Sequence, residues 1–159
     1  MEFKKIIMKK SLLIAACLAF VTVDAFTQDR GFGIGAIFGE PTGVSFKNWM
    51  SEEGAIDGGL AWAFEKQAAV NIHADYLLHN YSLVRVEEGR MPFYYGVGMR
   101  IKFESTTKLG IRIPVGFSYQ FAHDPLDLFF EIAPMLDLAP NTAFDLNGGI
   151  GIRYYFGQK

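Results

Sequence analysis

The sequence predicts an all-β protein: an eight-stranded antiparallel up-and-down transmembrane β-barrel, preceded by a cleaved signal peptide. Three observations lead to this fold class. Eight segments alternate large apolar side chains with small or polar ones, which is the period of a β-strand. A basic, apolar and then small-residue N-terminus precedes them. The face opposite the apolar one carries glycine and charges of both signs.

Residues 1–25 have the organisation of a secretory signal peptide. Four lysines lie in the first ten residues, an apolar run follows, and Val23-Asp24-Ala25 offers small residues for cleavage after Ala25. The apolar run is shorter than the ~20 residues that a transmembrane helix needs. Ile14–Cys17 also resembles a lipoprotein cleavage box, so lipidation of Cys17 stays open as an alternative. Residues 26–159 are predicted to form one outer-membrane barrel domain.

The first four predicted strands follow one another with short turns between most of them. Segment 31–39 alternates phenylalanine and isoleucine with glycine and ends in a Glu-Pro-Thr turn. Segment 43–49 opposes valine and phenylalanine to serine and lysine. Segment 56–64 opposes large apolar residues to aspartate, glycine and alanine. Segment 70–81 alternates most regularly, with asparagine, histidine and aspartate on its second face.

The last four predicted strands are more aromatic, and they occupy residues 93–103, 109–121, 126–138 and 144–156. Their turns are marked by serine and threonine, by His-Asp-Pro and by Ala-Pro-Asn-Thr. Pro114 and Pro134 fall inside these patterns, and each removes a donor from the sheet. We interpret both as bulges or strand-end kinks. No segment after the signal peptide has the period of a helix.

The composition of the two faces predicts which one meets lipid. A solvated outer face favours lysine, glutamate and threonine, whereas glycine and alanine fit the crowded inside of a narrow barrel. Five acids and five bases alternate with the apolar residues, which is close to neutral, as a closed interior needs. With two histidines they form a predicted polar network in the lumen: Lys47, Asp57, His73, Asp75, His79, Arg100, Lys102, Arg112, Glu131, Asp137, Asp145 and Arg153.

Three finer expectations follow from the same pattern. Arg153 is expected to pair with Glu131, Asp137 or Asp145. Ile152→Arg is expected to cost about 2–4 kcal/mol if this side chain lies near mid-bilayer. Aromatic residues near strand ends are expected to form interfacial girdles: Trp49, Trp62, Phe64, Tyr76, Tyr81, Phe93, Phe103, Phe121, Tyr154 and Phe156.

No pattern of catalytic, cofactor-binding or metal-binding residues is assigned. His73, Asp75 and His79 share one strand face, which suits a metal or acid–base set as well as ordinary lumen groups. No nucleophile motif surrounds Ser45 or Ser118. The glycine-rich segments lack the following helix that a dinucleotide site requires. The chain is therefore predicted not to be an enzyme, and no cofactor is predicted.

Four stretches carry a family resemblance: GIGAIFGEPTGVSFKNW, HADYLLHN, YYGVGMRIKF and EIAPMLDLAPNTAFDLNGGIGIRYYF. They resemble a family of small bacterial outer-membrane β-barrel proteins that mostly lack an assigned function, similar in architecture to OmpA/OmpX-type barrels. The resemblance covers roughly the whole mature chain and implies location and fold. The final alternation of Ile150, Ile152, Tyr154 and Phe156 looks like the signal that barrel-insertion machinery reads, although three more residues follow it.

The predicted function is that of an integral protein of the bacterial outer membrane with a packed polar lumen and a structural or adhesive, surface-interacting role. A narrow transport or small-ligand-binding barrel is the alternative, followed by a lipid-modifying enzyme and by a soluble lipocalin-like carrier with reversed faces. Expected partners are outer-membrane lipid, the insertion machinery and an external protein ligand. The net charge of -2 gives no reason to expect nucleic acid, and a monomer is expected. If both termini are periplasmic, the longest connection, 82–92, lies on the periplasmic side.

Overall fold

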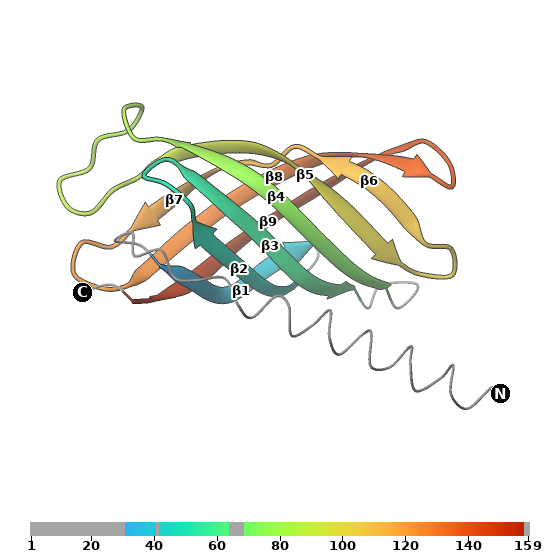
Figure 1. Cartoon of the computed structure of the whole chain (residues 1–159), viewed down its shortest axis with the longest axis horizontal. Helices are drawn as coiled ribbons and strands as arrows, with labels where there is room; N and C mark the ends of the chain where they lie inside the picture. The colour runs from blue at the N-terminus through green and yellow to red at the C-terminus, as the bar shows by residue number, and fades with distance from the viewer. Residues whose placement is uncertain (1–30, 41, 64–68, 158–159) are drawn as a thin grey trace.

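The chain folds into one closed antiparallel barrel (Figure 1), seen in a computed structural model that describes residues 31–40, 42–63 and 69–157. Its strands are β1 (Phe32–Glu40), β2 (Thr42–Trp49), β3 (Gly54–Ala63), β4 (Ala69–Asn80), β5 (Phe93–Phe103), β6 (Lys108–Arg112), β7 (Val115–Gln120), β8 (Leu126–Ala139) and β9 (Ala143–Phe156). Strands β1 to β5 pair in sequence order, and β8 pairs with β9. The first and last strands pair from Phe32↔Phe156 to Glu40↔Gly148, which closes the ring.

The ring has eight positions because β6 and β7 are two pieces of one stave. Both pair with β5 on one side and with β8 on the other. The predicted all-β, up-and-down, eight-stranded barrel is therefore confirmed, with the predicted strand 109–121 divided in two. The predicted signal peptide 1–25 and Cys17 lie outside the described residues.

The two prolines behave differently from each other. Pro114 lies in the break between β6 and β7, as expected of a strand-end kink. Pro134 lies inside β8 and keeps an unbroken register with β9, so the expectation of a bulge or kink there was wrong. Its carbonyl accepts a hydrogen bond from the Ile113 amide, so its missing donor lies on the side of the β6–β7 break. A proline inside a strand is tolerated where the neighbouring strand is interrupted, because no hydrogen bond to the missing N–H is needed there.

The outer face of the barrel is apolar and the inner face is polar. Large apolar side chains project outward from every stave, and most remain exposed, among them Phe130 (48%), Val97 (58%) and Ile150 (61%). On β2 the outward Val44 and Phe46 are half-buried. Among the described strand residues, the one charged side chain at an outward position is Glu40, the last residue of β1. Polar and charged side chains occupy the inward positions, and most of them are buried.

The ends of the barrel differ in their connections. The first described strand begins and the last one ends at the same end of the barrel, where the 81–92 connection between β4 and β5 also lies (Figure 1). We call this the terminal end. The connections described at the opposite end are shorter, such as 104–107 between β5 and β6. The longest described connection therefore lies at the same end as the start of β1 and the end of β9, as the topology of the predicted strands requires.

In the part of the chain that the structure describes, no helix is long and apolar enough to cross a membrane.

Candidate functional site

The lumen is filled by side chains that the period-two alternation directs inward from all eight staves. Nine of the twelve predicted lumen residues are at most 5% exposed: Lys47, Asp57, Asp75, His79, Arg100, Arg112, Glu131, Asp137 and Arg153. The other three, His73, Lys102 and Asp145, are partly exposed. The structure thus places all twelve on the inner face of the barrel.

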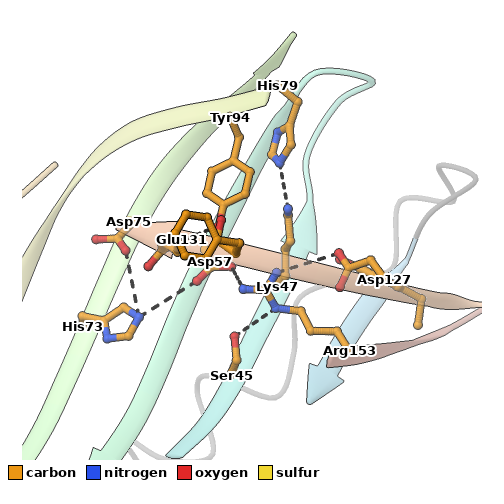
Figure 2. A network of polar contacts seen from close by, with 12 residues as sticks. Ser45, Lys47, Asp57, His73, Asp75, His79, Tyr94, Asp127, Glu131 and Arg153 are labelled. Carbon is orange, nitrogen blue, oxygen red and sulfur yellow. Dashed lines mark hydrogen bonds and ion pairs between the residues drawn. The ribbon is translucent and has the colours of Figure 1, made fainter. Parts of the chain in front are cut away.

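Arg153 on β9 is the centre of the network (Figure 2). Its guanidinium donates to Asp57 Oδ2 at 2.5 Å and to Ser45 Oγ at 2.9 Å, and Asp127 Oδ2 lies 3.8 Å from Nη1. The guanidinium also lies over the Phe129 ring, 3.7 Å from its centroid. These contacts join β9 to β2 and β3 across the lumen and to Asp127, which lies directly opposite Arg153 on the neighbouring strand β8. Together they offset the high cost of burying a charge.

A second arginine, Arg112, links β6 to β4 and to β8. Arg112 on β6 donates to Glu131 on β8 through a charge-assisted hydrogen bond, and its Nε lies 2.9 Å from Asp75 Oδ2 on β4. Tyr94 on β5 donates to the other oxygen of Glu131 at 3.1 Å. His73 lies beside this group, with Nε2 at 4.0 Å from both Asp75 and Asp57.

A buried lysine closes the lumen toward the terminal end. Lys47 Nζ donates to His79 Nε2 at 2.7 Å, and it also lies over the rings of Trp49 and Tyr94 at 4.6 and 5.3 Å. Because an ammonium group only donates, His79 Nε2 must accept this hydrogen bond. The ring proton therefore lies on His79 Nδ1, which donates to the Glu53 carbonyl at 2.9 Å. These side chains form a cation-aromatic plug.

The opposite end has its own, more open group of ion pairs. Arg100 donates to Asp137 at 2.7 Å and to Asp145 at 2.9 Å, and the Asp145 side chain is 44% exposed. At the β5–β6 turn, Glu104 lies 3.1 Å from Lys102 and 2.7 Å from Lys108. The hydrogen bond from Lys108 lowers the pKa of the Glu104 carboxyl below its ordinary value.

Inward glycines make room for the largest of these groups. A Cβ at Gly59 would overlap the His73 ring, one at Gly98 would overlap Asp75 Oδ1, and one at Gly151 would overlap the Phe129 ring. The glycines that suggested a crowded lumen in the sequence thus stand beside particular side chains. Any larger residue there would force its neighbour out of place.

The structure corrects two expectations about single residues. Arg153 pairs with Asp57 and Asp127, not with Glu131, Asp137 or Asp145. Trp49 is 6% exposed and packs 4.4 Å from the His79 ring, so it does not belong to an outer aromatic girdle. Trp49 stands two residues after Lys47 and four after Ser45 on β2, so it lies on the same inward face as these two residues. Phe64 of the predicted girdle lies outside the described residues.

The histidines and Asp127 also differ from what the sequence suggested. His79 contacts the Lys47 plug, whereas His73 lies near Asp75 and Asp57, so the three residues His73, Asp75 and His79 do not form one set. Asp127 is fully buried and accepts from the Tyr155 hydroxyl at 2.7 Å. Its alternation with Leu126 and Leu128 was the signal that could have identified it as a lumen residue.

Comparison with known proteins supports the architecture and assigns no family. No protein-family model matches the chain, and no curated protein matches its sequence. Its structure is similar to that of the N-terminal β-barrel domain of Pseudomonas aeruginosa OprF, with a TM-score of 0.59 and 12% sequence identity. The similarity covers 82% of this chain and 100% of the OprF chain. The fold is an OmpA-type barrel.

The chemistry that this lumen supports is that of a closed, charged core. The largest fully buried side chains, Arg153, Tyr94 and Lys47, come from three staves and meet inside the ring. The buried Ser45 hydroxyl accepts a hydrogen bond from Arg153, and Ser118 is fully buried. Neither hydroxyl is therefore accessible to a substrate outside the barrel. Among the described residues, one group has the composition of a metal site: Asp57, His73 and Asp75.

Proposed function

We propose that this chain is an integral protein of the bacterial outer membrane, whose packed lumen conducts no steady ion current and whose role is structural or surface-interacting rather than enzymatic. The observation that carries this proposal is the uncharged outer face. Between the strand ends, every described outward position is apolar, aromatic or uncharged. Charged residues facing lipid are strongly disfavoured, whereas the outer face of a soluble barrel has no reason to exclude them.

The height of the apolar surface fits a membrane. On β8 the exposed apolar positions run from Leu128 to Leu138, a span of ten residues. At ~3.4 Å per residue and a strand tilt of ~40°, this span is about 26 Å tall. Transmembrane barrels carry an apolar band of ~25 Å. The alternating C-terminal residues Ile150, Ile152, Tyr154 and Phe156 all lie on this outer face, where insertion machinery would read them.

The filled lumen favours a structural role over transport. An eight-stranded barrel is just wide enough for its side chains to fill it. Here the Lys47 plug lies toward the terminal end and the Arg153 and Arg112 groups cross the middle. The short connections described opposite the terminal end offer little surface for adhesion, which favours a structural role.

Cell fractionation and gel mobility test the membrane proposal. The full chain, expressed with its N-terminal segment in a Gram-negative host, is expected in the outer-membrane fraction and to require detergent for extraction. It is expected to migrate faster before heating than after, as a closed barrel does. Export of a soluble, monomeric protein that needs no detergent would contradict the proposal.

Planar-bilayer recordings test the closed lumen. We expect the purified, folded chain to give no steady conductance in a bilayer where a known open porin conducts. A reproducible open channel from the wild-type chain would instead support the alternative of a narrow transport barrel.

A further inference from the structure

Three lumen side chains on β3 and β4 surround a gap that none of them closes (Figure 2). His73 Nε2 lies 4.0 Å from Asp57 Oδ1 and 4.0 Å from Asp75 Oδ2. All three potential ligand atoms lie within 4.8 Å of one another. These distances are too long for hydrogen bonds, so the three groups face one another without satisfying one another.

Asp75 is the member of this group whose burial is least compensated by hydrogen bonds. Its side chain is fully buried, yet neither carboxylate oxygen has a hydrogen bond among the described residues. Arg112 Nε lies 2.9 Å from Oδ2, but its N–H is not directed at that oxygen. A buried carboxylate in this state has unused capacity to bind, and the oxygen with that capacity faces His73.

The surroundings hold the three side chains in position. Arg153 binds the second oxygen of Asp57, and Arg112 neutralises part of the charge on Asp75. Such outer partners orient the ligands of metal sites. Gly59 and Gly98 leave the space that the His73 ring and Asp75 occupy, since a Cβ at either position would overlap them.

The charge balance favours a cation. The connected network contains three basic residues, Lys47, Arg112 and Arg153, and four acids, Asp57, Asp75, Asp127 and Glu131. With His73 neutral and all four acids ionised, these residues carry one excess negative charge. An excess of this sign in a closed lumen attracts a positive ion.

We infer that Asp57, His73 and Asp75 form a binding site for one divalent transition-metal cation such as Zn²⁺. Imidazole and carboxylate are ligands that Zn²⁺ accepts, with bonds of ~2.0–2.2 Å. Ligand atoms of a tetrahedral site lie about 3.4 Å apart, so the two 4.0 Å separations from His73 close by side-chain movements of about half an ångström. The two carboxylate oxygens lie within 4.8 Å of each other and close by at most about 1.4 Å. His73 is 10% exposed and provides the access, and water completes the coordination.

Zinc titration of the untagged full chain, folded in detergent and stripped with a chelator, tests this site. We expect calorimetry to show one Zn²⁺ per chain, and Co²⁺ to give the visible absorption of a low-symmetry site. His73→Gln should weaken Zn²⁺ binding by at least ~10-fold, because even the loss of an outer partner costs that much. His123→Gln is the matched control, since His123 is 84% exposed in the 121–125 connection and should leave binding unchanged.

Two outcomes would overturn the inference: a folded wild-type chain that binds no Zn²⁺, or a His73→Gln variant that binds it as tightly as wild type. Gel mobility before and after heating verifies that each variant is folded. Asp57→Asn also disturbs the Arg153 ion pair, so His73→Gln decides the question and Asp75→Asn supports it. The membrane proposal is tested by other measurements and does not depend on this result.

Discussion

Replacing Ile150 by arginine tests whether the outer face of the barrel meets lipid or water. Ile150 is the eighth of the fourteen residues of β9, and its side chain is 61% exposed. In water, Ile→Arg at so exposed a position changes stability by no more than ~0.5 kcal/mol. At the middle of a bilayer the same change costs about 2–4 kcal/mol, falling to about 0–1 kcal/mol near the interface.

The structure gives a depth series on the same strand. Phe156 lies six residues from Ile150, which is about 20 Å along the strand and about 16 Å along the barrel axis at a tilt of ~40°. That distance exceeds half of the ~25 Å apolar band, so Phe156→Arg should cost about 0–1 kcal/mol. Ile152→Arg lies about 5 Å from Ile150 along the axis and should cost nearly as much as Ile150→Arg.

Equilibrium unfolding in lipid vesicles, followed by tryptophan fluorescence, measures each penalty. The expected order is Ile150 above or equal to Ile152, and both well above Phe156. A folded Ile150→Arg variant as stable as wild type would refute the lipid-facing assignment. Equal penalties at Ile150 and Phe156 would refute the depth argument, because a soluble surface has no such gradient.

Three further predictions concern the lumen and the β5–β6 turn. Arg153→Met should cost about 3–5 kcal/mol in unfolding experiments, because it leaves buried carboxylates without their partner. Gly98→Ala should cost about 1–3 kcal/mol, because its Cβ overlaps Asp75, whereas the outward Gly58→Ala has only one neighbour, at 3.2 Å, and should cost less. Glu104→Gln should lower the unfolding midpoint at pH 7. Because the pKa of Glu104 is depressed in the folded state, that difference should vanish as the pH falls through the folded pKa.

Each of these predictions has an outcome that would contradict it. Wild-type stability of Arg153→Met would mean that the buried ion pairs contribute nothing net. Equal stability of the two glycine variants would mean that the lumen is not tightly packed around Asp75. For Glu104→Gln, an effect that persists or grows at acid pH would show that the carboxylate form is not the stabilising one.

The strands could be predicted from the sequence because alternation is local. Each predicted segment lies within one or two residues of the observed strand ends, apart from the division at Pro114. Which face points inward also followed from composition, since glycine and charge share one parity. Trp49 was wrongly assigned to the outer aromatic girdle because its aromatic character was given more weight than its place in the alternation of β2.

The partners across the lumen could not be predicted in the same way. Arg153 meets Asp57 of β3 at a height set by strand tilt and by the stagger between staves. Neither quantity is contained in the period of a single strand. The three-residue group Asp57, His73 and Asp75 depends on the β3–β4 register, which sets Asp57 opposite Asp75 and Gly59 opposite His73. Only the assembled sheet brings these side chains together.

The size of the side chains, and not only their polarity, determines which face of this sheet is the lumen. On β5 the outward residues include Phe93, Tyr95 and Met99, whereas two of the inward residues are Gly96 and Gly98. A Cβ at either glycine would already overlap the neighbouring strand β4. An inverted barrel would have to place the large β5 side chains where there is no room for a methyl group. One alternating strand is therefore compatible with either orientation, and the inward glycines of this barrel favour the orientation seen here over the inverted, lipocalin-like one.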